Sequence, residues 1–401
     1  MTAYTSLSGE FNPTVPMRVV FGQGKAESIG AEIAALGGKR ALILSGRTVA
    51  EQTATVRQVH AALGDVAVGV YSGLTQRAPL ATAVEAANLA LSLEADTLVG
   101  VGGSTISDAA RTIAVLMAEG ITTVEELRRQ GRQQDLMMRP NLDDKALPLQ
   151  VSIPTTLSAG EFNMGGGNVL DNAAGHKIRV GHPRLYADLV VLDSEMTAGT
   201  PDWLWLSTGV KALDHCIERL YCQGNQPAID APVLSAAEML FYSLPRSGQA
   251  DGDAETRLQC LVAAWMSMMG APNFAVGLSH AIGHIVGVKY QVGHGYTSCV
   301  SQPYVMEYNR PSSAAKQALL ARAAGHDISG MSDEAAALLA SQAVDEFIIR
   351  LGMPHRLREL EIPEEDLTEI AELVLDDRGC RTNPVQITEK EQVMEVLWRA
   401  Y

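Results

Sequence analysis

Basic residues are few in this chain, and they do not cluster. Its 31 lysines and arginines are outnumbered by 46 aspartates and glutamates, so the formal net charge of the 401 residues is −15. Proteins that bind nucleic acid neutralise its phosphates with a basic patch, and no run of Lys or Arg stands out here. Nucleic acid is therefore not the expected partner, and we expect a small-molecule substrate instead.

Cysteine is also scarce, and no two cysteines form a Cys-x-x-Cys pair. The five cysteines are an odd number, which is typical of reduced thiols rather than of a disulfide framework. The first ten residues have neither the basic start nor the apolar run of a secretory signal. These absences predict a cytoplasmic protein.

Charged residues are missing altogether between Leu258 and Val288. A stretch of this length could span a bilayer, but Gln259, Pro272, Asn273 and two histidines interrupt it. Polar groups of this kind are unfavourable in lipid, so a pair of buried helices explains the stretch better than a membrane span. No membrane partner is therefore expected.

Short apolar segments alternate with helical stretches in the first half of the chain. The predicted helices and strands lie, in chain order, at residues 26–36, 40–45, 49–63, 66–71, 79–93 and 97–101. Such alternation is typical of a parallel sheet with helices on both faces, whereas helix follows helix after residue 196. The sequence therefore predicts an α/β protein of two domains. Residues 1–195 would form a Rossmann-like domain, residues 196–401 an all-α domain, and the active site would lie in the cleft between them.

The predicted strand that ends at Val101 leads into a turn with two glycines, Gly102 and Gly103. A helix should follow, with Ser104 and Thr105 available to cap it. Bare amides at a helix N-terminus attract phosphate, and glycines let a pyrophosphate approach the backbone. The turn is thus a candidate dinucleotide site, although a purely structural turn would have the same residues.

Three of the nine histidines fall within fifteen residues. His280 and His284 are four apart, so on a helix both imidazoles project from one face, and His294 follows between two glycines. Lys211 and His215 are also four apart, on an earlier predicted helix. Buried neutral histidines need partners, so these residues could form one site. The alternative is a core helix that happens to contain histidines, followed by a glycine turn.

Taken together, these residues resemble the iron-containing, or group III, alcohol dehydrogenases and in particular their maleylacetate reductase relatives. The likeness covers nearly the whole chain. It includes Arg-Val-Val-Phe-Gly at 18–22, Ile-Pro-Thr-Thr at 153–156 and Asn-Pro at 383–384. The resemblance implies a Rossmann-like domain that binds a nicotinamide cofactor and a helical domain that binds a divalent metal.

The resemblance also assigns roles to the histidines. His215, His280 and His294 take metal-ligand positions, and His284 takes the position of the proton donor near the nicotinamide. The family's fourth ligand is an aspartate, but here Lys211 stands in its place. A divalent ion about 4 Å from an ammonium would be disfavoured by roughly 8 kcal/mol at an effective dielectric near 20. We therefore expect the metal to be absent or weakly bound, with Lys211 and the three histidines stabilising negative charge instead.

The resemblance assigns a second set of residues to NADH or NADPH. They are Gly46, Arg47, Gly102, Gly103, Ser104, Asp108, Thr155, Thr156 and Lys177. Members of the family often hold the ribose 2′-hydroxyl with an aspartate where this chain has Gly46, followed by Arg47. Without that carboxylate NADPH is permitted and NADH is not excluded. Solvated surface positions for Arg47 and Lys177 remain open.

The expected function is hydride transfer from NAD(P)H to a small unsaturated keto acid, with maleylacetate as the leading candidate and 3-oxoadipate as its product. That reaction belongs to the catabolism of aromatic compounds. One alternative is a metal-dependent alcohol dehydrogenase in which Asp214 or water replaces the lost ligand. Against it, Asp214 projects about 100° away from His215 on a helix. Another alternative is a non-catalytic cofactor-binding protein. A homodimer is expected, because dimers are the commonest oligomers.

Overall fold

The computed structural model describes residues 17–76, 78–134, 136–163, 166–248, 253–270 and 275–401. The chain folds into two compact units, one of them Val15–Thr200 and the other containing Pro201–Tyr401. The first unit holds all the named strands, and the second consists of helices and loops over its described residues. The predicted fold class is therefore confirmed: an N-terminal domain built on a parallel sheet is followed by a helical domain.

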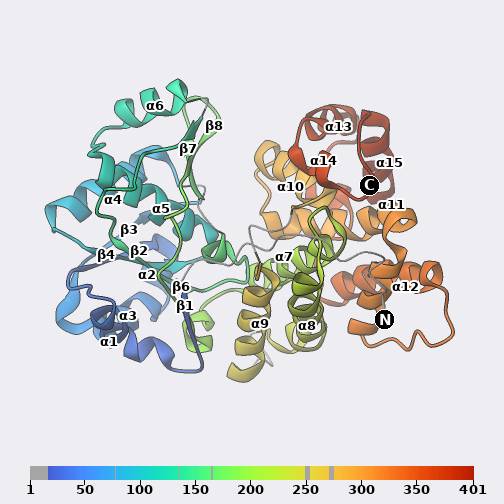
Figure 1. The fold of residues 1–401 in the computed structure, drawn as a ribbon, viewed down its shortest axis with the longest axis horizontal. Coiled ribbons are helices and arrows are strands. Elements are labelled where there is room, and N and C mark those ends of the chain that lie inside the picture. The colour runs from blue at the N-terminus through green and yellow to red at the C-terminus, as the bar shows by residue number, and fades with distance from the viewer. Residues whose placement is uncertain (1–16, 77, 135, 164–165, 249–252, 271–274) are drawn as a thin grey trace. The chain divides into compact units, whose positions relative to one another are not determined.

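The first unit is built on a six-stranded sheet in which every pairing is parallel (Figure 1). The order of its strands is β1-β9-β6-β4-β2-β3. Their bounds are β1 Arg18–Phe21, β2 Ala41–Gly46, β3 Ala67–Leu74, β4 Thr97–Gly102, β6 Leu149–Pro154 and β9 Leu189–Leu192. The central strands are buried on both faces, as expected where helices cover both sides of a parallel sheet.

Helices cover the two faces of this sheet, and successive strand residues pack to opposite sides. The helices are α1 Ile29–Ala35, α2 Arg47–Gln52, α3 Thr55–Leu63, α4 Leu80–Ser92 and α5 Ser104–Glu119, while the next helix, α6 Val124–Gln133, packs against α4. Leu42 and Leu98 belong to the core cluster formed with α4 and α5, while Ile43 and Val99 belong to the cluster formed with α1 and α3. This division follows from the two-residue period of a strand.

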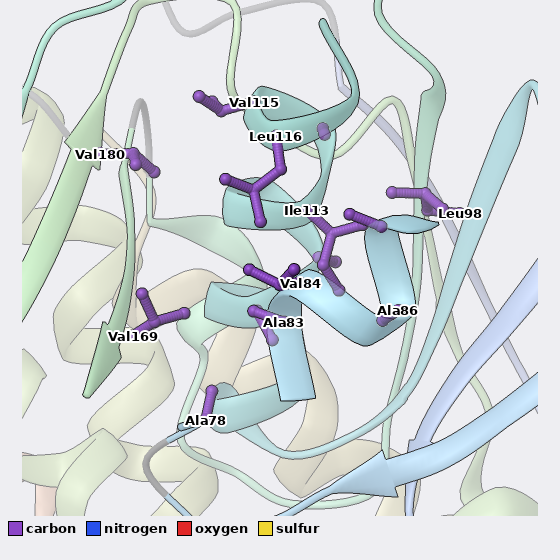
Figure 2. Packing of buried hydrophobic residues seen from close by; sticks show 14 of the residues in the cluster. Ala78, Ala83, Val84, Ala86, Leu98, Ile113, Val115, Leu116, Val169 and Val180 are labelled. Atoms are coloured by element: carbon purple, nitrogen blue, oxygen red, sulfur yellow. The ribbon is translucent and has the colours of Figure 1, made fainter. Parts of the chain in front are cut away.

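A small second sheet extends the α4–α5 core. It contains β5 Met137–Met138, β7 Gly166–Asp171 and β8 His176–Gly181, in the order β5-β8-β7. Figure 2 shows Val169 and Val180 of this sheet gathered in one cluster with Val84 of α4 and Ile113 of α5. The small sheet therefore completes the hydrophobic core beside α5, the helix that follows the double-glycine turn.

The second unit is helical. Its main helices are α7 Asp202–Tyr221, α8 Pro227–Ser243, α9 Ala254–Ser267, α10 Leu278–Lys289, α11 His294–Ala323, α12 Asp333–Arg350, α13 Leu367–Leu375, α14 Arg378–Thr382 and α15 Lys390–Ala400. Helix α7 is buried from Ser207 to Tyr221, so its ionisable side chains must find partners inside the unit. Within the described part of the chain, no helix has both the length and the apolar composition needed to cross a bilayer.

Candidate active site

The sheet unit brings the candidate cofactor loops together at one edge. Strand β4 pairs with β2 on one side and β6 on the other, so the turns after Gly46, Gly102 and Pro154 leave neighbouring strand ends. The order of the strands reverses between β2 and β4, because β3 lies beyond β2 while β4 lies on the other side of it. Ligands of open α/β sheets bind at such a switch point, outside the carboxyl ends of the strands.

The double-glycine turn has no room for side chains. Gly102 has φ +153°, and a Cβ there would lie 2.6 Å from Cγ1 of Ile106. A Cβ on Gly103 would lie 3.0 Å from the Thr156 hydroxyl oxygen. Glycine is therefore required at Gly102 by its conformation and favoured at Gly103 by close packing.

Helix α5 begins at Ser104 with Gly103 as its N-cap, and no side chain caps it. The expectation that Ser104 and Thr105 cap this helix is therefore wrong, because both residues already lie in its first turn. The Ser104 amide donates a long hydrogen bond of 3.3 Å to the Ser158 hydroxyl. An uncapped N-terminus at the switch point is a suitable binding place for a pyrophosphate.

The two threonines after β6 lie beside this turn. The Thr155 amide donates to the Gly102 carbonyl at 3.0 Å, and the Thr156 and Ser158 hydroxyls are 2.9 Å apart. Both threonines are buried. The structure thus places Thr155 and Thr156 against the turn, while their hydrogen bonds to a ribose stay a prediction.

Asp108 of α5 and Lys177 of β8 belong to one polar cluster. Asp108 accepts a hydrogen bond of 2.6 Å from the Asn168 amide and lies 3.6 Å from Arg111. Burial raises the pKa of Asp108 to about 6, although Arg111 and Lys177 act to lower it. Lys177 is therefore close enough to Asp108 to interact with it electrostatically, and a role for either residue in cofactor binding stays a prediction.

Arg47 occupies the first turn of α2, directly after β2. Its side chain is 75% exposed and lies 3.8 Å from Glu51. The guanidinium is thus solvated, in line with the alternative reading of this residue. Its exposure also leaves it accessible to a 2′-phosphate, so its role in cofactor choice stays a prediction.

Sequence reasoning missed Arg111, which anchors the loop that follows Thr156. Its buried guanidinium donates to the carbonyls of Gly160, Glu161 and Gly166 at 2.9, 2.8 and 3.3 Å. Ala159 in this loop has φ +55°, a conformation that glycine adopts more easily. The signal in the sequence was a single arginine in the otherwise apolar middle of α5.

The helical unit brings all five predicted chemical residues into one cluster. Lys211 and His215 come from α7, His280 and His284 from α10, and His294 from the first turn of α11. The ring centroids of His215 and His280 are 5.3 Å apart, those of His280 and His284 6.4 Å, and those of His284 and His294 5.9 Å. The imidazoles therefore form a continuous row.

Asp214 also belongs to this cluster. Its carboxylate lies 2.9 Å from the Lys211 ammonium and 3.6 Å from Nδ1 of His280, and it accepts a 2.6 Å hydrogen bond from Ser298. Its offset from His215 was expected to count against Asp214 as a replacement ligand, but the offset does not keep the carboxylate away from the cluster, and metal binding by Asp214 stays a prediction. The side chains of Lys211 and Asp214 are three residues apart, so they point in directions that differ by only about 60° around the helix axis. The i, i+3 relation to Lys211 was the signal that could have placed it.

Glu218 holds the start of α10. Its two oxygens accept the Gly277 and Ser279 amides at 2.7 and 2.8 Å, and Nδ1 of His280 lies 2.6 Å away. The carboxylate is fully buried. It therefore caps α10 and fixes the ring of His280 at the same time. This contact uses Nδ1 and leaves the Nε2 atom of His280 for another partner.

Burial and paired charges shift several pKa values in the cluster. Burial alone would raise the pKa of Asp214, but the Lys211 ammonium and His280 bring it down to about 2. Burial, together with the Arg219 and Lys211 cations, holds the pKa of His215 well below its usual range. Burial and Lys211 also lower the pKa of His280. These shifts favour the neutral form of the two inner imidazoles and the ionised form of Asp214.

Two buried atoms in the cluster, Oδ1 of Asp214 and Nδ1 of His215, have no hydrogen-bond partner among the described residues. Ligand atoms of Asp214, Glu218 and His280 lie within 4.8 Å of one another, a spacing that could hold a metal ion. However, the Lys211 ammonium already binds Asp214. The contact of His280 Nδ1 with Glu218 is no obstacle, because it leaves Nε2 as the nitrogen that could reach an ion. As the side chains stand, this donor set does not fit an ion, because Lys211 would have to move first.

Asp214 also changes the electrostatic argument about a metal. The expected repulsion between Lys211 and a metal ion assumed that Lys211 is an unpaired cation. In the structure, the Asp214 carboxylate lies 2.9 Å away and compensates its charge. The prediction that the metal is absent or weakly bound therefore loses its electrostatic support. What remains is the chemistry of the ligands, since an ammonium cannot donate a lone pair to an ion.

Models of one protein family match the sheet unit and the helical unit in turn. The family model "Iron-containing alcohol dehydrogenase" matches residues 16–194, and the model of that family's C-terminal domain matches residues 205–401. The chain belongs to the iron-containing alcohol dehydrogenase family and is an oxidoreductase of that family. The predicted family resemblance is thus confirmed.

Relatives with several different activities resemble the chain. Dehydrogenase ALT3 of Alternaria alternata is 30% identical over 91% of this chain and 99% of its own length. An NAD-dependent methanol dehydrogenase of Bacillus methanolicus is 27% identical over 96% and 98%. Maleylacetate reductase 1 of Cupriavidus pinatubonensis is 26% identical over 94% of both chains. The crystal structure of a 1,3-propanediol oxidoreductase has a TM-score of 0.89 at 23% identity, covering 98% of this chain and 100% of that one.

Proposed function

We propose that this protein is an NAD(P)H-dependent reductase of small unsaturated keto acids, with maleylacetate as the leading substrate and little or no dependence on a metal. The observation that carries the proposal is Lys211, an ammonium where the family resemblance expects a metal-binding aspartate. Although Asp214 compensates its charge, the Lys211 ammonium has N–H donors beyond the one given to Asp214, and these can bind a substrate carboxylate and the oxygen on which negative charge develops. Simple alcohols and aldehydes carry no carboxylate to exploit that cation.

In the proposed reaction, maleylacetate accepts a hydride from the nicotinamide and a proton from His284, giving 3-oxoadipate and NAD(P)⁺. The side chain of His284 is 41% exposed, so the imidazole can regain its proton from water. Lys211, with His215, His280 and His294, would hold a substrate carboxylate or the enolate that precedes protonation. Asp214 keeps the ammonium in place through its 2.9 Å contact.

For the cofactor, we propose that the uncapped N-terminus of α5 binds the pyrophosphate through the turn at Gly102, Gly103 and Ser104. The absence of a carboxylate at Gly46 permits either NADH or NADPH, and exposed Arg47 would favour the 2′-phosphate of NADPH. The expected result is binding of both cofactors, with NADPH affinity falling more than NADH affinity in Arg47→Ala. Fluorescence titration of each cofactor measures it.

The decisive assay follows oxidation of NADH and of NADPH by the purified protein with maleylacetate and with simple aldehydes, before and after treatment with a chelator. We expect maleylacetate to be reduced with a higher kcat/KM than any aldehyde, and the chelator to leave the rate unchanged. Rapid aldehyde reduction that the chelator abolishes would overturn the proposal. Cofactor binding without turnover of any carbonyl compound would favour a non-catalytic protein.

One observation favours a second candidate, a metal-dependent alcohol dehydrogenase. Asp214 has one buried oxygen without a partner, and its carboxylate lies near His280 and Glu218. If Lys211 swung away, Asp214 could replace the missing aspartate as a ligand. Metal analysis separates the candidates, since this one requires a divalent ion at a stoichiometry of about one per chain.

We also propose that the protein is a cytoplasmic homodimer that acts in the breakdown of aromatic compounds. The support is general: reduced cysteines suit the cytoplasm, and dimers are the commonest oligomers. Light scattering coupled to gel filtration measures the oligomeric state. A monomer would contradict that part without touching the proposed chemistry.

A further inference from the structure

Both histidines of α10 are held at Nδ1 by a carboxylate from another segment. His280 is 2.6 Å from Glu218 of α7, and His284 is 2.9 Å from Asp377, the residue that precedes α14. The two pairs differ in exposure, because the His280 side chain is 9% exposed and that of His284 41%. The outer pair is thus the one that water can reach.

Asp377 is fixed by its own surroundings before it meets His284. It is the N-cap of α14, where its Oδ1 accepts the Gly379 amide at 2.8 Å, so Oδ2 is left for the imidazole. Helix α14 lies tightly against the start of α10, since a Cβ on Gly379 would clash with the Gly277 carbonyl oxygen. The carboxylate is therefore presented to His284 from a rigid contact between two segments.

An ionised carboxylate can only accept a hydrogen bond. Burial acts to raise the pKa of Asp377, but the hydrogen bonds from His284 and the Gly379 amide bring it below its usual value. Nδ1 of His284 must then carry the hydrogen in this contact, whether the ring is neutral or charged. The nitrogen left to exchange a proton with a substrate is Nε2.

We propose that Asp377 is a positioning residue that fixes the Nδ1–H form of His284, so that His284 delivers its proton only from Nε2. The proposal rests on the proposed role of His284 as proton donor. A carboxylate bonded to a catalytic histidine keeps the ring in the tautomer and orientation that proton transfer requires. Without it the ring can rotate or carry its hydrogen on the wrong nitrogen.

The first test is a double-mutant cycle on maleylacetate reduction with Asp377→Asn, His284→Ala and the double variant. The asparagine side chain keeps an oxygen that can accept the Gly379 amide, but it loses the negative charge that holds the imidazole. We expect Asp377→Asn to lower kcat by roughly 10–100-fold with KM nearly unchanged, as is usual for carboxylates that orient a functional histidine. In the His284→Ala background the same substitution should have no further effect, and Asp377→Glu should recover part of kcat.

The matched control is a carboxylate–imidazole pair outside the cluster. Glu359 lies 3.3 Å from Nδ1 of His355, so Glu359→Gln removes the same kind of contact and should leave kcat unchanged. An equal loss from Asp377→Asn in the presence and absence of His284 would show a purely structural role. That result would overturn the proposal.

The second test does not depend on turnover. Nitrogen chemical shifts of histidine side chains in the isotopically labelled full chain report which ring nitrogen carries the hydrogen, with His284 assigned through His284→Ala. At alkaline pH we expect His284 protonated on Nδ1 in the wild type and on a mixture of nitrogens in Asp377→Asn. A wild-type His284 protonated on Nε2 would overturn the proposal whatever the substrate. Lack of maleylacetate reduction with the expected shifts would instead reject the proposed function and leave the positioning of His284 supported.

Discussion

The two units build their candidate sites from different parts of the chain. In the sheet unit, the site is a turn of glycines and main-chain amides at the N-terminus of α5, with no capping side chain. In the helical unit, the site is a set of buried ionisable side chains that compensate one another, such as Lys211 with Asp214 and His280 with Glu218. The first site depends on backbone conformation, and the second on keeping each charge paired.

This difference predicts how each unit fails. A substitution in the glycine turn should weaken cofactor binding because it changes the conformation of the turn. Salt and pH should have little influence on the size of that loss. A substitution in the histidine cluster should harm stability because it leaves a buried charge or amide without its partner. The predictions below follow this contrast from the largest expected effect to the smallest.

The largest effect is expected from Glu218→Ala. It removes a fully buried carboxylate and leaves the Gly277 and Ser279 amides without their acceptor. Breaking a buried charged contact of this kind costs about 3–5 kcal/mol of the free energy of unfolding. Urea denaturation measures it, with Glu369→Ala at an exposed pair with Lys289 as control. That control should lose less than about 1 kcal/mol, and equal losses would refute the distinction between buried and exposed pairs.

Glu161 in the sheet unit should make stability depend on pH. Burial raises its pKa to about 7, although Arg111 opposes the rise. Between the ordinary pKa of glutamate and pH 7, the folded state therefore binds more protons than the unfolded state. The free energy of unfolding consequently falls as pH rises through that range. The loss should be about 3 kcal/mol. Stability curves of the wild type and Glu161→Gln measured from acid to neutral pH should converge at low pH. Parallel curves would show that Glu161 does not titrate in this way.

A smaller effect is expected from Gly102→Ala. The new methyl group would clash with Ile106, and φ +153° is unfavourable for alanine. We expect about 1–3 kcal/mol of strain and a roughly tenfold weaker Kd for NAD(P)H, which is about 1.4 kcal/mol. Gly293→Ala is the matched control in the helical unit, because nothing lies within 4 Å of its Cβ. Unchanged cofactor affinity in Gly102→Ala would remove the turn from the cofactor site.

The sequence was sufficient for the main sheet and the helical unit because their signals are local, whereas the small sheet of β5, β7 and β8 was not predicted. Strands β2 and β4 are short apolar runs that end in glycine, and helices of regular length separate them. The spacing of Lys211 and His215, and of His280 and His284, likewise placed each pair on one helix face. Their meeting across α7, α10 and α11 was an inference from family resemblance, since no local pattern encodes it.

The partners of the clustered histidines and of Lys211 could not be predicted from local sequence patterns. Glu218 and Asp377 reach the α10 histidines from segments 62 and 93 residues away along the chain. Asp214 was set aside because its angle was measured from His215 alone, while its actual partner is Lys211. Arg111 acts through backbone carbonyls, which leave no trace in residue types. In each case the missing information was which neighbour a side chain finds in three dimensions.

We infer that Lys211 replaces a metal ligand. Mass spectrometry can measure the content of divalent metal in the wild type and in Lys211→Asp after both have been incubated with Fe²⁺ or Zn²⁺ and desalted. We predict little metal in the wild type and about one ion per chain in the variant, where a carboxylate joins three imidazoles. One tightly held ion per wild-type chain, removed together with activity by a chelator, would contradict the account.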